Sequence, residues 1–485
     1  MSADAAQRYL EVERKFDVDA STRPPSFDDV HGVARVARAE TQTLDAVYFD
    51  TAERALASHR VTLRRRTGGH DAGWHLKLPA GPDARTEVRA PLAGDEPPAE
   101  LLDVVLAIVR DQPVGPVARI GTTRQVTWLH GADDAVLAEF CDDQVTAGRG
   151  PDGETAQQRW REWELELVGD GASADLLDRL CDRLLGAGAK PAGHGSKLAR
   201  VLDTSPTALP SDPLRRALAE QTGELLEWDR AVRAEADDAV HQMRVTARKI
   251  RSLLQASPES FGLDGSAPVI GELRELGTVL GVARDAEVLA ERYRDALDAV
   301  PPELVRGPIR HRLVDGADQR YRSGLRHALA AMRLPRYFRL LDLLDALVAR
   351  APVEHSEPAQ ATVATVGKKV RKAAKKAEHT HAGPDRDEAI HRIRKRAKRL
   401  RYTADATGAK KVSKRAKKLQ SLLGDHQDSV VSREHLAQQA EAAHAAGEDT
   451  FTYGLLYQRE ADLAVESRRQ LEPTLTRLLK AARKL

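Results

Sequence analysis

The sequence predicts an α+β multidomain protein, with an internally polar antiparallel β-barrel in its N-terminal part and an all-α domain of two repeated helical bundles in its C-terminal part. Three observations predict this fold class. Short segments that alternate charged and apolar residues occupy most of residues 9–202. Long segments rich in Ala, Leu, Arg and Glu, with a period of 3.6 residues, follow Pro213. Two stretches of this second part recur in the same order.

The composition limits the classes of protein to which the chain can belong. A length of 485 residues is enough for two or three domains with cores of their own. The net charge of +2 conceals a charged fraction of 31%, so the local distribution of charge matters more than its total. The mean hydropathy is −0.47, no apolar run approaches about 20 residues, and the first residues lack the pattern of a signal peptide. We therefore expect no membrane partner.

The two cysteines, Cys141 and Cys181, indicate a reducing compartment. They are too few for a disulfide framework and show no zinc-ligand spacing with the scattered histidines. Neither lies in a catalytic motif, and the chain has no Gly-x-x-x-x-Gly-Lys phosphate-binding loop. We expect a cytoplasmic protein.

The first predicted strand, residues 9–16, carries most of its charge on one face. Side chains alternate between the faces of a strand, so Glu11, Glu13 and Lys15 project one way and the apolar Val12 and Phe16 the other. Two carboxylates about 7 Å apart, followed by an ammonium group, suit a site for divalent cations and an anionic ligand. Alone, such a strand is more often a solvated face.

Later strands repeat the alternation, with charges grouped by sign. Arg64 and Arg66 share a face, and Lys77 lies opposite the apolar residues of its own strand. Further charged faces are formed by Arg85, Glu87 and Arg89, and by Glu162, Glu164 and Glu166. Acidic groups open and close the region and basic groups fill its middle, which favours a barrel that binds metal at one place and phosphate at another.

Residues 99–110 and 174–185 interrupt the strands. Their apolar residues have helical spacing, so we expect two helices on the exterior of the barrel. Residues 205–213 are rich in Pro and Ser and indicate a linker. The predicted domains are therefore 5–205, a linker at 206–213, and 214–485.

The N-terminal part resembles the CYTH, or triphosphate tunnel metalloenzyme, family. The resemblance rests on motifs in the family's order: Glu11-x-Glu13-x-Lys15, Tyr48-Phe49-Asp50-Thr51, Leu63-Arg64-x-Arg66, the strand of Lys77, Thr123-Arg124, Asp142, Glu162-x-Glu164-x-Glu166 and Gly195-Ser196-Lys197-Leu198. It implies an eight-stranded antiparallel tunnel that hydrolyses a triphosphate with Mg²⁺ or Mn²⁺.

The resemblance also implies roles for individual residues. The metal ligands would be Glu11, Glu13, Asp142, Glu162, Glu164 and Glu166, and the phosphate ligands Lys15, Arg64, Arg66, Lys77, Arg89, Arg124 and Lys197. The catalytic set would be Glu11, Glu13, Lys15, Glu164 and Glu166. Asp143 and Glu139 lie beside Asp142, so which of these three acids faces the metal stays open.

The C-terminal part contains an internal repeat. Residues 239–251 match 389–401, and residues 276–288 match 419–431. The repeat predicts two similar bundles, about 214–350 and 363–485, joined near residues 351–362. In both copies a basic stripe lies beside an apolar one, and a duplicated row of like charges suggests an anionic partner, although a solvated face is the alternative.

This part resembles the CHAD family, the conserved-histidine helical domain often fused to CYTH, which is associated with polyphosphate binding. The resemblance implies a binding surface made of His241, Arg244, Arg248, Arg251, His391, Arg394, Lys395, Lys398, Arg401 and Tyr402. Arg392, Arg396 and Arg399 are expected on the outer face of their helix, and Asp285 and Asp428 are expected to cap helices or pair with arginine.

The sequence therefore predicts a hydrolase of inorganic triphosphate joined to a polyphosphate-binding module in the cytoplasm, with association with polyphosphate granules left open. Four alternatives remain: a thiamine triphosphatase, a nucleoside or RNA triphosphatase, an adenylate cyclase, or a non-catalytic polyphosphate scaffold. Nucleic-acid binding is disfavoured because few aromatic residues accompany the basic helices.

Overall fold

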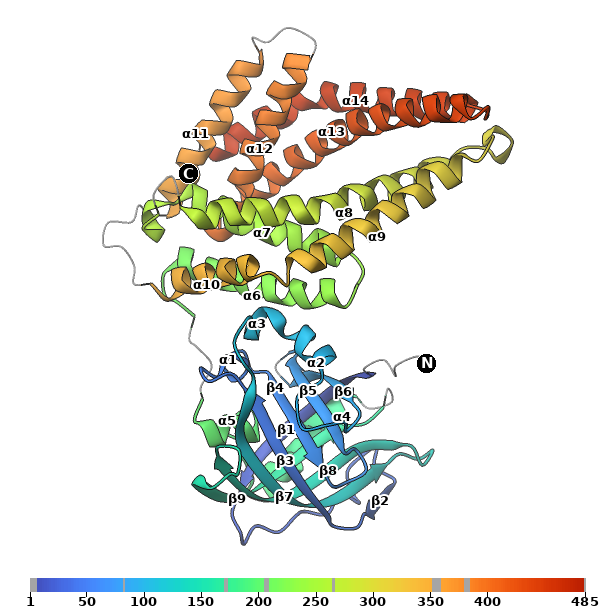
Figure 1. Cartoon of the computed structure of the whole chain (residues 1–485). Helices are drawn as coiled ribbons and strands as arrows, with labels where there is room; N and C mark the ends of the chain where they lie inside the picture. Colours follow the sequence, from blue (N-terminus) through green and yellow to red (C-terminus); the bar gives the residue numbers. More distant parts are fainter. Residues whose placement is uncertain are drawn as a thin grey trace. The chain divides into compact units, whose positions relative to one another are not determined.

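The computed structural model divides into two compact units, Met1–Ala208 and Leu209–Leu485 (Figure 1). It describes residues 7–81, 83–169, 173–204, 209–263, 267–350, 359–378 and 384–483. Most of the stretch expected to join the two helical bundles, and residues 206–208 of the expected linker, lie outside these ranges.

The N-terminal unit is a closed antiparallel barrel of eight strands, as expected. Around the ring the order is β1 (Gln7–Val18), β6 (Ala84–Ala90), β5 (Gly73–Pro79), β4 (Thr62–Thr67), β3 (Gln42–Asp50), β7 (Gly115–His130), β8 (Val136–Arg149) and β9 (Thr155–Leu167). Pairing of β9 with β1 closes the ring. The short strands β2 (Arg35–Arg38) and β10 (Lys190–Pro191) add to β7 and β1. Closure leaves the eight strands without a free edge.

The alternation of side chains determines what lies inside and outside the barrel. On β9, Trp163 and Leu165 point outward, where they pack with Phe140 of β8 against the apolar face of α4 (Ala174–Gly186). The glutamates between them point inward. The helix predicted at 174–185 is therefore confirmed on the barrel exterior, and it holds β8 and β9 in the register that brings their acids together.

The helix predicted at 99–110 is wrong as one continuous element. The chain forms α2 (Ala99–Val104) and α3 (Leu106–Val109), with Val105 at the break. Ala107, Ile108 and Val109 are all buried. These three consecutive residues of α3 span about 200° of the helix circumference, so α3 is covered on most of its surface. Two other short helices, α1 (Ala55–Ser58) and α5 (Lys197–Leu202), follow strand ends.

The C-terminal unit is all helical. Its first half has α6 (Pro213–Arg233), α7 (Ala239–Ala256), α8 (Pro268–Asp298), α9 (Gly316–Ala331) and α10 (Pro335–Ala349), and its second half has α11 (Ala359–Glu378), α12 (Pro384–Ala406), α13 (Lys410–Ala445) and α14 (Phe451–Ala482). Helices α8 and α9 form one long antiparallel pair and α13 and α14 another (Figure 1). Among the described residues, no helix is both long and apolar enough to span a membrane.

The repeat seen in the sequence is visible in how each basic helix meets the next long helix. In the first half, Arg244 of α7 lies over Gly281 of α8, where an added Cβ would be 3.2 Å from the guanidinium. In the second half, Arg394 of α12 lies over Gly424 of α13, where the corresponding distance is 3.3 Å. Glycine thus permits the same close approach twice. Helices α7 and α12 also contact each other, which brings the two basic stripes to one place.

Candidate functional site

The interior of the barrel is a cavity of about 140 Å³ lined almost entirely by charged and polar side chains. Inward positions of all eight barrel strands, the loop between β4 and β5, and the start of α5 supply them. The lining includes Glu11, Glu13, Lys15, Tyr48, Arg64, Arg66, His70, Asp71, Lys77, Arg85, Glu87, Arg89, Arg124, Glu139, Glu164, Glu166 and Lys197. All seven expected phosphate ligands are in this set. Of the expected metal ligands, Glu11, Glu13, Glu164 and Glu166 line the cavity, and Glu162 lies next to it.

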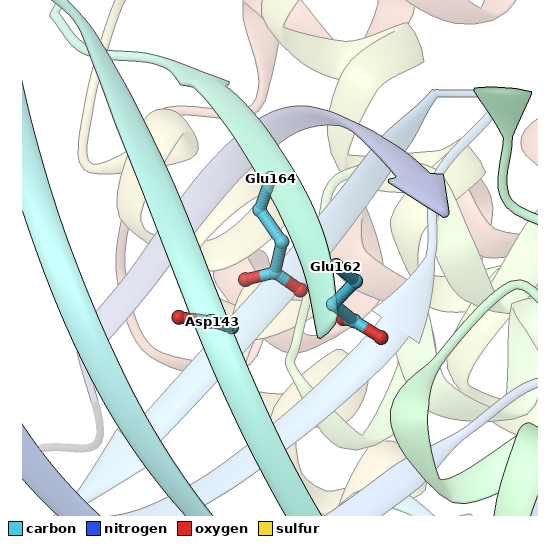
Figure 2. Close-up of side chains that lie close together, drawn as sticks. All are labelled: Asp143, Glu162 and Glu164. Carbon is cyan, nitrogen blue, oxygen red and sulfur yellow. The ribbon is translucent and has the colours of Figure 1, made fainter. Parts of the chain in front are cut away.

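One group of acids lies between β8 and β9. Asp143 comes from β8, and Glu162 and Glu164 come from the neighbouring strand β9 (Figure 2). One carboxylate oxygen of each lies within 4.8 Å of the other two. Lys197 of α5 is 2.9 Å from Asp143 and 2.7 Å from both glutamates, and Arg124 donates to Asp143 at 2.6 and 2.8 Å.

These cations already neutralise the first acid group. Burial alone would raise the pKa of Asp143, but Arg124 and Lys197 hold it below its ordinary value. A divalent ion could bind there only by displacing Lys197 or Arg124 from the carboxylates. The cluster has the oxygen donors that Mg²⁺ and Mn²⁺ prefer, but its carboxylates already have lysine and arginine partners.

A second acid group lies one row along the strands. Glu166 is directly opposite Glu139 of β8 and Glu13 of β1, which places three carboxylates side by side across three strands. Burial raises the pKa of Glu166 to about 8; Lys77 opposes this shift, and Glu11, Glu13 and Glu139 add to it. Among the described residues no ion pair or hydrogen bond of the Glu166 carboxyl is found. Glu13 accepts from Lys15 at 2.8 Å and Glu139 accepts from the Cys141 thiol at 2.9 Å, so Glu166 is the acid of this row that lacks a partner among the described residues. A divalent cation beside it would supply the missing positive charge.

Asp142 does not face this interior. It lies on the outward face of β8 and accepts two hydrogen bonds from Arg161, at 2.6 and 2.8 Å. Of the three acids that could have faced the interior, Glu139 and Asp143 do so and Asp142 does not. The strand alternation is the reason, because residues 139 and 143 are on one face and 142 on the other. We therefore no longer place Asp142 among the metal ligands.

The cations of the cavity wall are held by a buried glutamate. Glu87 of β6 is 1% exposed and lies 3.8 Å from Lys77 and 4.0 Å from Arg64, and it also accepts from Arg89. Burial would raise its pKa, yet His75 and these cations keep the pKa far below the ordinary value. Glu87 thus remains an anion that orients the basic side chains toward the cavity.

Tyr48 supplies a hydroxyl group among the same cations. Arg64 donates to its oxygen at 3.3 Å. Burial opposes ionisation of the phenol, but Arg64, Lys197 and Arg66 outweigh it and lower the pKa of Tyr48. The following residues of its motif are structural, since Asp50 accepts hydrogen bonds from the backbone of Thr51, Leu56 and Ala57.

Lys197 reaches the cavity because a helix begins at that position. The Ser196 hydroxyl accepts from the backbone N–H of Ala199 and so caps α5. The Lys197 side chain, 9% exposed, then points into the acid group between β8 and β9. The four-residue motif at 195–198 therefore acts as one unit, a cap followed by a ligand.

The sequence assigned no role to three residues of the cavity, Tyr48, Asp71 and Glu87, and left Glu139 open as one of three acids that could face the metal. Three of them were indicated by strand alternation, since Glu87 shares a face with Arg85 and Arg89, and Tyr48 and Glu139 lie on the inward faces of their strands. No sequence pattern indicated Asp71, because it enters the cavity from a loop.

The basic stripes of the helical unit converge where α7 and α12 meet. Lys398 is close to Arg248, Arg394 and Arg244, and burial together with these charges lowers the pKa of Lys398 to about 7. The same causes lower the pKa of Arg248 to about 10. Among the described residues no carboxylate lies within 4 Å of Lys398 or Arg248. This surface, made of Arg244, Arg248, Arg394 and Lys398, is termed the cation cluster below.

The other expected polyphosphate ligands differ in their burial and in their contacts. Burial lowers the pKa of His241 and of His391, and the Nδ1 atom of His391 is buried without a hydrogen-bond partner. Tyr402 is 2% exposed, and the Arg401 guanidinium lies 5.4 Å from the centre of its ring. Arg251 is half-buried and Lys395 is exposed.

Two expectations about neighbouring side chains have different outcomes. Asp285 pairs with Arg244 at 3.0 Å, as expected for a helix aspartate beside arginine. Arg399 does not lie on the outer face, because it donates to Gln255 of α7. Only Arg392 and Arg396 of that trio are exposed.

Comparison with known proteins agrees with this division of the chain. Residues 10–174 match the CYTH domain and residues 216–437 match the CHAD domain. A protein of Mycobacterium tuberculosis, "Uncharacterized protein MT2285", is 63% identical over 100% of this chain and 99% of its own length. Among solved structures, PptA from Streptomyces chartreusis is 18% identical and covers 56% of this chain and 100% of its own, with a TM-score of 0.46. The CHAD domain from the plant Ricinus communis is 22% identical and covers 57% of this chain and 93% of its own, with a TM-score of 0.42.

Proposed function

The chain belongs to the proteins that join a CYTH domain to a CHAD domain, and on this basis we propose that its barrel hydrolyses inorganic triphosphate with Mg²⁺ or Mn²⁺ and that its helical unit binds inorganic polyphosphate. The observation that carries the proposal is the inner surface of the barrel. Cations from β1, β4, β5, β7 and α5 surround a cavity that also holds Glu166, a buried carboxyl with no ion pair among the described residues.

The cations would bind the substrate through its phosphate oxygens. Arg64, Arg66 and Arg124 offer planar pairs of donors that match phosphate oxygens, and Lys15 and Lys77 add point charges. Together they would neutralise a triphosphate, which carries several negative charges in a space shielded from water. Fixed charges of this kind favour the in-line transfer of a terminal phosphoryl group to water.

The carboxylates would hold the metal. Glu13, Glu139 and Glu166 provide oxygen donors from three adjacent strands, with Glu11 and Glu164 nearby. When bound, a divalent cation would supply charge neutralisation on the phosphate oxygens and would orient the attacking water. Transfer to water needs no side-chain nucleophile, and both cysteines are buried with raised pKa values.

The lining of the cavity favours an inorganic substrate over a nucleotide. Tyr48 is the one phenol or indole ring among the described lining residues, and its hydroxyl is engaged by Arg64. A purine or thiazole ring would therefore meet charged groups rather than an aromatic surface. This supports inorganic triphosphate over ATP or thiamine triphosphate.

The helical unit would bind a longer anion. The cation cluster places four basic side chains from two helices together, of which Arg244 is paired with Asp285 while Arg248 and Lys398 have no carboxylate within 4 Å among the described residues. Further basic residues continue along α7 and α12. A thin, flexible polyphosphate chain can follow such a surface, whereas duplex DNA is a wide and stiff rod. We therefore propose polyphosphate as the ligand, bound without cleavage.

The test is a rate comparison with the full chain. Initial rates of phosphate release are measured on inorganic triphosphate, ATP and thiamine triphosphate, each with Mg²⁺, with Mn²⁺ and with a chelator. We expect metal-dependent release that is fastest on inorganic triphosphate. Equal or faster ATP turnover would contradict the preference, and the absence of any metal-dependent release would contradict the enzymatic function.

A further inference from the structure

A loop of the barrel enters the cavity and pairs with one of its arginines. Residues 68–72 connect β4 to β5, and two of them, His70 and Asp71, line the cavity. The Asp71 carboxylate forms an ion pair with Arg66 of β4. The Arg66 side chain is only 7% exposed, so this is a contact inside the cavity and not a surface pair.

The Arg66 guanidinium is buried, and Asp71 is its direct ion-pair partner, while Glu87 adds a weaker compensating charge. Burial, with Arg64 and Arg124 nearby, lowers the pKa of Arg66 to about 9. Its Nε atom is buried without a hydrogen-bond partner, and among the described residues no second ion pair of Arg66 is found. A buried cation with one unmet donor has a strong preference for an anion in front of it.

The loop can reach the cavity because glycines allow it to lie against β3. Gly68 has a φ of +80°, and a Cβ added there would be 2.1 Å from the carbonyl oxygen of Thr43. Gly69 has a φ of +72°, and its Cβ would be 2.8 Å from the Leu44 side chain. Any other residue at these positions would push the loop away from the barrel wall.

A buried histidine anchors the base of the same loop. The Nε2 atom of His75 lies 2.9 Å from the carbonyl oxygen of Asp71, which can only accept, so Nε2 carries the proton and donates. The other ring nitrogen, Nδ1, lies 2.9 Å from Glu87. The backbone of Asp71 is therefore tied to the glutamate that orients the cations, while its side chain faces Arg66.

We propose that Asp71 is a positioning residue that holds Arg66 in the ligand-free cavity and is displaced by a phosphate group of the substrate, so that loop 68–72 acts as a gate. This inference rests on the proposed function of the barrel. A carboxylate can take the place of a phosphate oxygen because both accept paired hydrogen bonds from a guanidinium. When triphosphate enters, its terminal phosphate takes the donors of Arg66, and the loop loses its side-chain contact. Binding therefore includes the cost of breaking the Arg66–Asp71 pair.

Removing the charge of Asp71 isolates this cost. The variant Asp71→Asn keeps the size of the side chain but cannot form the ion pair. Triphosphate should therefore bind to this variant about tenfold more tightly than to the parent, which is the same protein with Asp71 intact. Asp45→Asn is the matched control, because Asp45 also pairs with an arginine, Arg119, but on the exterior of the barrel. Its affinity should equal that of the parent.

Binding is measured by calorimetry with the full chain, a chelator to prevent turnover, and inorganic triphosphate as the titrant. Every protein carries Arg244→Ala and Arg394→Ala, which reduce binding to the helical unit. Hydrogen exchange of the wild-type chain supplies a second readout that needs no variant of the loop. Backbone amides of residues 68–72 should exchange faster once triphosphate is bound, since the loop is released.

Each outcome bears on the gate. Tighter binding by Asp71→Asn with faster exchange of residues 68–72 supports it. Unchanged or weaker binding by that variant, or slower exchange of the loop, overturns the gate while leaving the barrel as a triphosphate site. A parent protein that binds no triphosphate, whether or not Mg²⁺ is present, overturns the proposed function and the gate together.

Discussion

Replacing Lys398 with methionine should stabilise the helical unit while weakening its binding of polyphosphate. Lys398 lies in the cation cluster, where burial and the charges of Arg248, Arg394 and Arg244 lower its pKa from 10.5 to about 7. Methionine has a similar length and no charge, so Lys398→Met removes the repulsion and keeps most of the packing.

The magnitude follows from the shift in pKa. Between pH 7 and pH 10.5 the unfolded chain holds a proton on Lys398 that the folded chain releases, so the stability of the wild type rises with pH across this window. The methionine variant lacks this dependence. It should exceed the wild type in free energy of unfolding by about 4 kcal/mol at pH 7 and by only about 1 kcal/mol at pH 9.5.

The assay is urea unfolding followed by circular dichroism at 222 nm, at pH 7 and pH 9.5 and in low salt. Lys414→Met is the control, because Lys414 is exposed on α13 and should change the stability little. Added polyphosphate should stabilise the wild type more than Lys398→Met, and so reduce the difference at pH 7. Equal stability of the two proteins at pH 7, or a difference that grows with pH, would refute the electrostatic account of the cation cluster.

Three further predictions concern the two sites. Glu13→Gln and Glu166→Gln should each abolish metal-dependent phosphate release while the far-ultraviolet spectrum is unchanged, whereas Asp142→Asn should retain release; a wild-type rate for either glutamine variant would place the metal elsewhere. Arg244→Ala combined with Arg394→Ala should weaken polyphosphate binding at least tenfold and reduce the slope of log K against log salt by roughly two. Arg392→Ala alone, on the exposed face of α12, should change the affinity and the slope little. Lys197→Met should lower the free energy of unfolding by about 3 kcal/mol, because three carboxylates lose their shared cation, and divalent metal should restore part of this loss. Tryptophan fluorescence reports the last effect, since four of the five tryptophans lie in the barrel; an unchanged midpoint would contradict it.

Local pattern in the sequence was sufficient to predict the inward faces of the strands. Side chains alternate along a strand whatever surrounds it, so the inward positions of Glu11, Glu13 and Lys15, and those of Arg64 and Arg66, follow from spacing alone. The repeat likewise predicted two matching basic helices, because helical period and sequence identity are both properties of the chain itself.

Only the tertiary structure decided which charges neutralise one another. Closure of the barrel decides which face of β8 is inward, and so places Asp143 and not Asp142 beside Lys197. The pairing of β1, β9 and β8 places Glu166 beside two other acids, where it has no ion pair among the described residues. The contact of α7 with α12 turns two separate stripes into the cation cluster, and the loop at residues 68–72 brings Asp71 to Arg66. These pairings join residues that are far apart in the chain or belong to different elements. Their energies depend on distance and burial, which the order of residues does not contain.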